Sequence, residues 1–106
     1  MIQVPITNDP NQTLSITIPL ITGNQTFQFI VRWNRAALYW QLTVSQRGSI
    51  LINNLPLITG LGLTVNILAQ YAYLGIGNAY VLAVGKPASD YPQVGDWGTS
   101  FFLLWE

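Results

Sequence analysis

Hydrophobic and polar residues alternate with a period of two along the first half of the chain. In residues 13–20, leucine and isoleucine occupy every even position, and threonine, serine and proline occupy every odd one. The same alternation runs through residues 26–33, with Ile30 as the exception, and through residues 38–45. Because side chains along a strand point alternately to opposite faces, this pattern predicts strands with one buried face.

Short polar or glycine-containing stretches separate these segments and predict turns. The strands predicted in this half are residues 2–6, 13–20, 26–33 and 38–45, and residues 50–52 begin another strand. Pro19 has no backbone N–H, so it marks a sheet edge or the end of a strand. Strands that follow one another at short, even intervals are typical of an antiparallel meander.

The second half of the chain is less regular. After an apolar stretch with glycines, residues 63–74 are the one place where a short helix fits. Thr64 or Asn66 is the candidate N-cap of this helix, and Gly75 or Gly77 is its candidate end. β-Branched residues in the same segment leave an irregular or strand conformation open.

Two further strands are predicted after this segment. Residues 79–84 form the first, and residues 101–105 are apolar throughout, as in a strand buried on both faces. Residues 86–99 between them form a long loop rich in Pro, Gly, Asp and Ser. The chain is therefore predicted to be a single all-β domain over residues 1–106, an antiparallel meander that forms a small sandwich or barrel. We expect about six to eight strands and at most one short helix.

Charged residues make up 8% of the chain, against about 25% in an ordinary globular domain. The four basic and four acidic residues balance and are scattered along the sequence. A nucleic-acid-binding protein normally carries a basic patch that neutralises phosphates, so we expect no nucleic-acid partner. Sparse charge leaves little repulsion between copies, which favours a homo-oligomer and a place inside a larger assembly.

No charged residue occurs between Gly48 and Gly85. A membrane-spanning helix of about 20 apolar residues is one explanation of such a stretch. Asparagine, glutamine and glycine interrupt it, so we favour buried strands with a tight apolar loop and expect no membrane insertion. The first five residues have neither the basic start nor the apolar run of a secretion signal.

The chain contains no histidine and no cysteine. It therefore lacks the commonest general base and the commonest transition-metal ligands, and we expect no metal site, no cofactor and no enzymatic activity. Asp90 and Asp96 are the one candidate carboxylate pair for a hydrolase or a hard-cation site. We favour the alternative, in which each aspartate hydrogen-bonds its own backbone in a turn.

Aromatic residues are the strongest remaining signal. Phe29, Trp33 and Trp40 alternate with polar residues in predicted strands, and we expect them in the core. Tyr91 and Trp97 lie in the polar loop before the last strand, where burial by the domain itself is less expected. Aromatic residues in such loops often anchor protein interfaces, and they also stack on sugars.

Tyr71 and Tyr73 lie in the uncharged stretch, which is longer than a core of this size needs. We predict that part of it, residues 59–77, is covered by another chain, with the two tyrosines as anchors. The alternative is that both tyrosines fill the core of the domain itself. The predicted protein-interface residues are Tyr71, Tyr73, Tyr91 and Trp97.

Short segments spaced along nearly the whole chain carry a resemblance to a known family. They are residues 14–18, 27–34, 40–44 with Gly48 after them, 55–60, 73–75, 90–92, Gly98 and 102–105. In this order they resemble the baseplate plug proteins of contractile-tailed phages and related prophages. The resemblance rests on the order of the elements, and none of the segments is diagnostic alone.

The resemblance implies a non-enzymatic structural subunit of a phage baseplate, near the central axis of hub and spike. Its partners would be hub, spike or tube proteins, and its location would be the virion tail, or the host cytoplasm during assembly. The resemblance assigns no catalytic residue. An alternative of a different class is a carbohydrate- or peptide-binding β-sandwich module that uses Tyr91 and Trp97 as a stacking platform.

Overall fold

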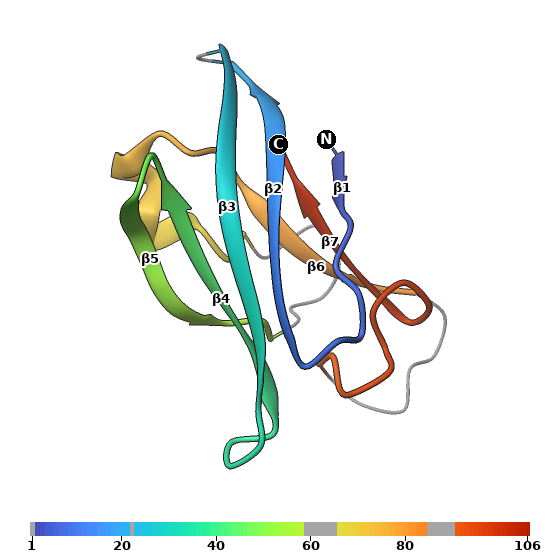
Figure 1. Cartoon of the computed structure of the whole chain (residues 1–106). Coiled ribbons are helices and arrows are strands. Elements are labelled where there is room, and N and C mark those ends of the chain that lie inside the picture. The colour runs from blue at the N-terminus through green and yellow to red at the C-terminus, as the bar shows by residue number, and fades with distance from the viewer. Residues whose placement is uncertain (1, 22, 59–65, 85–90) are drawn as a thin grey trace.

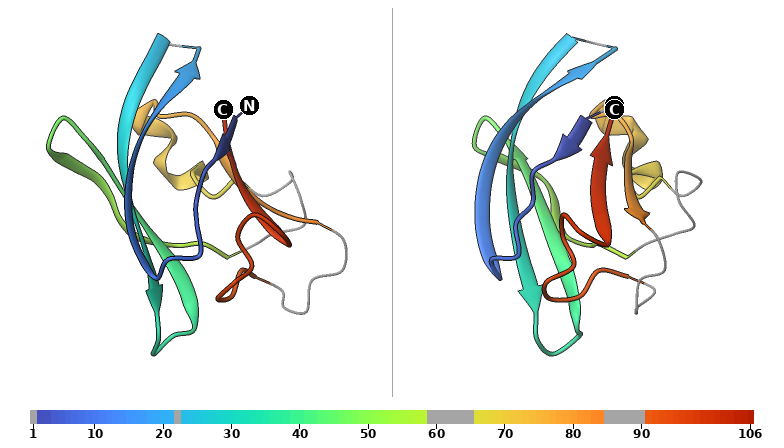
Figure 2. Two further views of the ribbon diagram at one scale, coloured as in Figure 1. Left: turned by 45° about the vertical axis from the view of Figure 1, so that its right-hand side comes forward. Right: turned by 90° about the vertical axis from the view of Figure 1, so that its right-hand side faces the viewer.

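The structure is a computed structural model that describes residues 2–21, 23–58, 66–84 and 91–106. Seven strands in these residues form two antiparallel sheets that face each other as a small sandwich (Figures 1 and 2). The first sheet contains β2 (Asn11–Leu20), β3 (Gly23–Asn34), β4 (Tyr39–Gln46) and β5 (Ser49–Pro56), in that spatial order. The second sheet contains β1 (Ile2–Val4), β7 (Phe101–Trp105) and β6 (Ala79–Ala83), with β7 in the centre. The predicted all-β fold is confirmed, as a sandwich and not as a closed barrel.

Tight turns connect the four strands of the first sheet in chain order. β2 and β3 pair without interruption along the whole of β2. β4 and β5 are joined by Arg47 and Gly48, whose φ angles of 52° and 82° fit a type I′ turn. The backbone of this turn matches the right-handed twist of the strands, and the turn predicted here from sequence therefore forms a hairpin.

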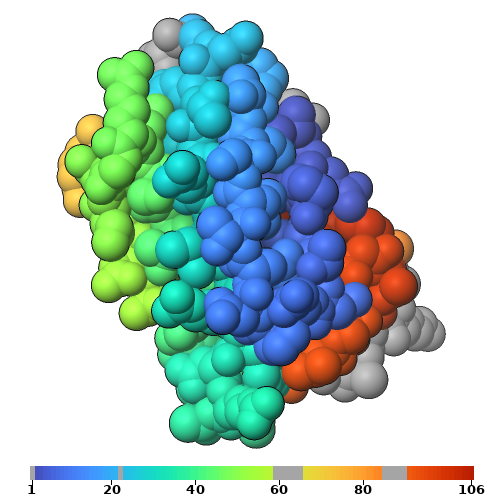
Figure 3. Space-filling model, in the orientation of Figure 1, coloured from blue at the N-terminus to red at the C-terminus, as the bar shows by residue number. Residues whose placement is uncertain are grey.

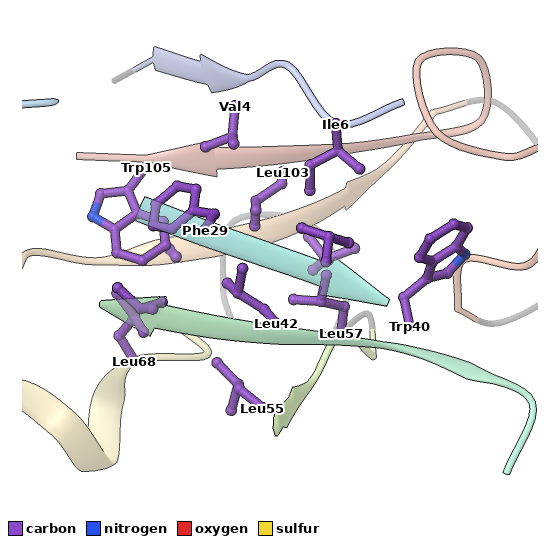
Figure 4. Packing of buried hydrophobic residues seen from close by; sticks show 14 of the residues in the cluster. Val4, Ile6, Phe29, Trp40, Leu42, Leu55, Leu57, Leu68, Leu103 and Trp105 are labelled. Atoms are coloured by element: carbon purple, nitrogen blue, oxygen red, sulfur yellow. The ribbon is translucent and has the colours of Figure 1, made fainter. Parts of the chain in front are cut away.

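The core lies between the two sheets, where the large apolar residues of the alternating segments meet. Phe29 of β3 and Trp105 of β7 stack across it, with their ring centroids 5.0 Å apart (Figure 4). Trp105 also donates its indole N–H to the carbonyl oxygen of Ile76 at 2.8 Å, so its one polar atom is satisfied inside the core. The largest fully buried side chains are Trp40, Trp105, Phe27, Phe29, Phe101, Ile18, Leu42, Leu57, Leu68, Ile76, Leu103 and Val31.

Two of the three aromatic residues expected in the core have no exposed surface. These are Phe29 and Trp40. Trp33 is half-buried, and its ring packs edge-on against the ring of Trp40 with centroids 5.5 Å apart. Trp33 lies just before the β3–β4 turn, which projects from the sandwich (Figure 1), and this position leaves part of its ring exposed.

One short helix occurs in the described residues, the 3₁₀-helix η2 (Ala69–Leu74). It occupies the second half of the segment predicted to be helical, residues 63–74; residues 63–65 lie outside the described range. Gly75 follows with a φ of 65°, the left-handed conformation that ends many helices, as predicted. The backbone of η2 departs from helical angles at Tyr71, where φ is −109°, so the helix is kinked at this residue.

Asn66, one of the two candidate N-caps, does not cap η2. Its side-chain oxygen accepts the backbone N–H groups of Leu68 and Ala79, each at 3.0 Å. It therefore ties the segment before η2 to the first residue of β6. Leu68 is the N-cap residue and makes no capping hydrogen bond with its side chain. The other candidate, Thr64, lies outside the described residues.

β7 corrects the prediction of a strand buried on both faces. Phe101, Leu103 and Trp105 are buried, whereas Phe102 and Leu104 are only partly buried. The first sheet covers one face of the second sheet (Figure 2), so alternate side chains of β7 point away from it. All five residues are apolar, and the sequence pattern therefore could not distinguish the inner face from the outer one.

β5 begins at Ser49, beside residues 50–52 that predicted its start, and continues to Pro56. Its pairing with β4 shifts register at Val44, and Asn54 has a left-handed φ of 55°. A bulge of this kind breaks the period of two, so the continuation of the strand could not be seen in the sequence.

The uncharged stretch from Gly48 to Gly85 contributes β5, η2 and β6 in its described parts. No helix of the described residues is long and apolar enough to cross a membrane. The expectation of buried strands is met only in part: Ile52 and Leu55 of β5 and Ala79 and Val81 of β6 are buried, and the other residues of both strands are partly or fully exposed. The apolar loop around residues 59–62 lies outside the described range.

Candidate protein-interaction surfaces

The outer face of the first sheet, which is turned toward the viewer in Figure 3, carries mostly polar, uncharged side chains. The hydroxyl groups of Thr17 and Thr26 lie 2.7 Å apart across β2 and β3, and the Thr43 hydroxyl donates to the side-chain oxygen of Asn53 at 3.2 Å. Arg32 is the one charged residue in the four strands of this sheet. Another protein can therefore cover most of this face without burying an unpaired charge.

η2 carries two of the tyrosines predicted as interface anchors. Tyr73 is 80% exposed, whereas Tyr71 is half-buried and packs against the core. Tyr73 therefore offers nearly its whole ring to a partner, and Tyr71 offers only part of its ring. That another chain covers them stays a prediction, because the structure contains this chain alone.

Trp97, a third predicted interface residue, is buried in the chain itself. Only 3% of its surface is exposed, and its ring meets the ring of Trp40 with centroids 6.3 Å apart. Asn8 holds its backbone: the Trp97 N–H donates to the Asn8 Oδ1 at 3.0 Å, and the Asn8 Nδ2 donates to the Trp97 carbonyl oxygen at 3.2 Å. Trp97 therefore has little ring surface to give to a partner or to a sugar.

The loop that contains Trp97 also contains Tyr91, the fourth predicted residue. Tyr91 is partly buried, and Gln93 after it accepts the indole N–H of Trp40 on its carbonyl oxygen at 3.1 Å. This loop lies at the opposite end of the sandwich from η2 (Figures 1 and 2). The four predicted residues therefore form no single patch. The sequence could not show this, because contacts of Trp40 and Asn8 with a distant loop leave no local pattern.

Asp96 takes part in a turn. Its carboxylate accepts the backbone N–H of Gln93 at 2.8 Å, and its carbonyl oxygen accepts the N–H groups of Ser100 and Phe101 at 3.0 and 3.1 Å. This is the structural role favoured from sequence. Asp90 lies outside the described residues, so the distance between the two carboxylates is not defined. In the part of the chain that the structure describes, no three His, Cys, Asp or Glu residues are grouped closely enough to hold a metal ion.

A groove of about 460 Å³ opens at the end of the sandwich that carries the β2–β3 turn, and no sequence motif pointed to it. The residues that line it are Pro19, Leu20, Ile21, Gly75, Gly77, Asn78 and Glu106. Glu106 is its one charged side chain, and it accepts a long hydrogen bond of 3.4 Å from the Tyr80 hydroxyl. Desolvation and the Glu106 carboxylate together raise the pKa of Tyr80 above 10.0.

Apolar residues are exposed at this same end of the molecule. Ile21 at the β2–β3 turn and Ile50 beside the β4–β5 turn are both exposed, as is Tyr73 on η2. Gly77, close after η2, lies against Leu20 and so places the helix near the β2–β3 turn. We call this end of the sandwich, at the top of Figure 1, the upper end.

Residues 1–106, the whole chain, match the model of a protein family described as the cyanophage baseplate Pam3 plug gp18. No curated protein matches the chain. The family is one of baseplate plug proteins, which agrees with the resemblance carried by the order of the elements in the sequence.

Proposed function

Since the chain belongs to the cyanophage baseplate plug family, we propose that it is a subunit of a contractile tail that sits near the central axis of the baseplate. In this position it contacts hub, spike or tube proteins. Family membership makes it a structural baseplate protein of the phage tail, associated with other baseplate proteins. The observation that supports the finer proposal is the match of residues 1–106 to a family described as a baseplate plug.

The surface chemistry supports a place between other proteins. The outer face of the first sheet has one charged side chain, and the upper end exposes Ile21, Ile50 and Tyr73. Hydroxyl and amide groups exchange water for protein partners at low cost, and exposed apolar side chains favour burial. We assign the upper end, with Tyr73 as its central aromatic anchor and Tyr71 beside it, to contacts with a baseplate partner. Tyr91 is assigned to a lesser contact at the opposite end.

The proposed role requires no chemistry from the chain. Asp96 uses its carboxylate in a turn, which leaves it poorly placed to act on a substrate. The alternative of a carbohydrate-binding module needs an exposed stacking platform, and Trp97 is buried against Trp40. No feature of the described residues favours this alternative over the structural role.

The test is to interrupt the gene for this chain in the phage that carries it and to supply variants from a plasmid. The expected result is a loss of infectious particles, with tails that lack a complete baseplate in electron micrographs. The wild-type chain and the matched variant Asp96→Asn should both restore infection. Normal baseplates and full infectivity without the chain would contradict the structural role.

The position near the axis is tested separately by cross-linking purified tails and identifying the linked peptides by mass spectrometry. We expect links from residues of the upper end to hub, spike or tube proteins. Because the upper end has no lysine in its described residues, a photo-reactive residue in place of Tyr73 is the suitable probe, with one in place of Val94 as the matched control at the other end. Links to peripheral tail proteins alone would contradict the axial position.

A further inference from the structure

The four edge strands of the two sheets differ in how far they are protected from pairing with another strand. β1 has three residues, and β6 has five, with Ala79 already accepting the N–H of Ile67 at 2.9 Å. β5 is bulged and contains Asn54 in a left-handed conformation. β2 has ten residues and an unbroken register, and it carries no charge. Short, bulged or charged edges resist pairing, so β2 is the unprotected edge among the described strands.

The direction of the free backbone groups of β2 follows from one hydrogen bond. The Trp33 N–H donates to the carbonyl oxygen of Pro10, the residue before β2, at 2.9 Å. In the register of β2 and β3, the even-numbered residues of β2 therefore direct their backbone N–H and C=O groups toward β3. In an antiparallel pair these positions alternate. The N–H and C=O groups of Thr13, Ser15 and Thr17 therefore face the open edge, and no described residue hydrogen-bonds to them. In Figures 1 and 2, β1 and the segment that leads from it to β2 lie on this side of β2, but β1 belongs to the second sheet and pairs with β7 and not with β2.

The open stretch ends in the same way on both sides of Ser15. Four residues before it, the Asn11 N–H is already bonded to the Asp9 carboxylate at 3.0 Å. Four residues after it, Pro19 has no N–H to offer. If a second β2 lies antiparallel with Ser15 opposite Ser15, Asn11 of each copy faces Pro19 of the other. The two positions that have no free backbone N–H then lie opposite each other, and Thr13, Ser15 and Thr17 of each copy can form all of their backbone hydrogen bonds with the other copy.

The side chains agree with the same register. Leu14 and Ile16 point toward the core but are only half-buried, whereas Ile18 on the same face is fully buried. In the Ser15-centred pairing, Leu14 of one copy lies beside Ile16 of the other, so each covers the apolar surface that the other leaves open. Thr13 lies opposite Thr17 on the outer face, and no like charges meet.

From these observations we propose that β2 is a self-association site. Two copies of this chain pair their β2 strands antiparallel about a two-fold axis at Ser15, which joins their first sheets into one continuous sheet. The pairing gives about six hydrogen bonds across the axis. This inference rests on the β2 edge alone and does not depend on the proposed place in the baseplate.

The test uses charges at position 15 and measures mass by sedimentation equilibrium. Ser15 is exposed on the outer face, so Ser15→Lys and Ser15→Glu should both leave the fold intact, as judged by circular dichroism and melting temperature. Wild type should form a species of twice the monomer mass of 11.8 kDa. Each charged variant alone should dimerise about tenfold more weakly or worse, because like charges meet on the axis. An equimolar mixture of the two should recover the dimer, and Ser15→Thr should behave as wild type.

A second variant checks the backbone. Ser15→Pro removes an N–H that faces the open edge and leaves the bonds to β3 intact, so the monomer should fold while dimerisation falls about tenfold or more. A wild-type chain that stays monomeric at all concentrations would overturn the proposal. So would a dimer that ignores every change at position 15, or a mixture of Lys and Glu variants that does not pair. If β2 is protected from hydrogen exchange only in assembled tails, a different protein occupies the edge and the second-copy proposal is wrong.

Discussion

At the scale of single residues, exposure divides the aromatic side chains of this protein into two groups. Trp97 and Trp40 pack against each other, and Trp40 gives its indole N–H to the Gln93 carbonyl oxygen. The Trp97 Nε1–H is buried with no hydrogen-bond partner in the described residues, which is a cost to stability that the ring contacts must offset. Tyr73 has no such contacts and is available to other chains.

The two tyrosines of η2 should respond differently to truncation. Tyr73→Ala removes an exposed ring, so the free energy of unfolding should change by no more than about 0.5 kcal/mol. Tyr71→Ala removes a ring that packs against the core and should lower it by about 1–2 kcal/mol. Urea denaturation of the purified variants measures both effects.

The same variants test the interface assignment at the upper end. Binding of Tyr73→Ala to the baseplate partner should weaken by about 2 kcal/mol, as for a central aromatic anchor. Val94→Ala, an exposed apolar residue at the opposite end, serves as the control and should bind normally. Unchanged affinity of Tyr73→Ala would remove Tyr73 from the interface.

Tyr80 makes stability depend on pH in the alkaline range. Desolvation and Glu106 raise the pKa of its hydroxyl in the folded chain above the ordinary value of 10.0. The unfolded chain therefore loses this proton first, and the stabilising difference, complete below pH 10, is lost as pH rises through the folded pKa. Denaturation curves at pH 9, 10 and 11 should show a steeper decline for wild type than for Tyr80→Phe. Parallel declines in the two proteins would contradict the assignment.

At the scale of elements, the connection between η2 and β6 depends on one close approach. Gly77 has a φ of 95°, and a Cβ atom there would overlap the Glu106 carbonyl oxygen and come within 2.8 Å of the Leu20 Cδ2. Glu106 and Asn78 exchange backbone hydrogen bonds of 2.8 and 2.9 Å, which extend the β6–β7 pairing past its last strand residue. A side chain at position 77 would therefore push this extension away from β2.

Gly77→Ala should lower the free energy of unfolding by about 3 kcal/mol or more, because it adds this overlap to the backbone strain. Gly75→Ala is the matched control. Gly75 has a φ of 65°, but nothing lies within 4 Å of its Cβ position, so the cost should be about 1 kcal/mol. Thermal melts of the two variants compare their stabilities. Equal losses of stability would show that the close contact at position 77 contributes nothing to the cost.

The strands that could be predicted best from the sequence are those in which hydrophobic and polar residues alternate. The alternation in residues 13–20 and 26–33 predicted β2 and β3 within a few residues, because each strand has one face in the core and one in solvent. Residues 101–105 gave no alternation, although β7 alternates in burial. The bulge in β5 broke the pattern in the same way. Periodicity thus locates a strand only where the exposed face is polar and the register is regular.

At the scale of the whole molecule, two sheets are held together chiefly by side chains, since few backbone bonds pass between them. Phe29 of the first sheet stacks on Trp105 of the second at 5.0 Å. Such aromatic pairs contribute about 0.5–1.5 kcal/mol beyond the area that they bury. A double-mutant cycle with Phe29→Leu and Trp105→Phe should therefore give a coupling energy in that range.

The control cycle pairs Trp40→Phe with Trp105→Phe. These rings make no contact with each other, and they lie at opposite ends of the core (Figure 4). Their effects on stability should add within about 0.5 kcal/mol. Additive effects in the Phe29 cycle as well would mean that the sheets are joined by general burial and not by this pair.

The site could be predicted from sequence far less well than the fold. Tyr73 was named as an anchor because it lies in the uncharged stretch, and it is exposed; Trp97 was named because it lies in a polar loop, and it is buried. Trp97 is held by residues far from it in sequence: its ring packs against Trp40, and its backbone bonds to Asn8, 89 positions away. Contacts over such separations leave no signature in the local pattern. The groove beside Glu106 was missed for the same reason, since its lining comes from three separate segments.

The strand order of the second sheet has a consequence for how the protein is made. β1 pairs with β7 alone, Ile2 opposite Trp105, so the ribosome synthesises nearly the whole chain between the two partners. At about 5–20 residues per second this interval lasts roughly 5–20 s. In its second half, after β5 has been made, the apolar face of the completed first sheet, with Phe27 and Phe29, lacks the cover of the second sheet. The nascent chain is therefore exposed to aggregation until β7 leaves the ribosome, and slower translation of the segment before β7 should lower the soluble yield.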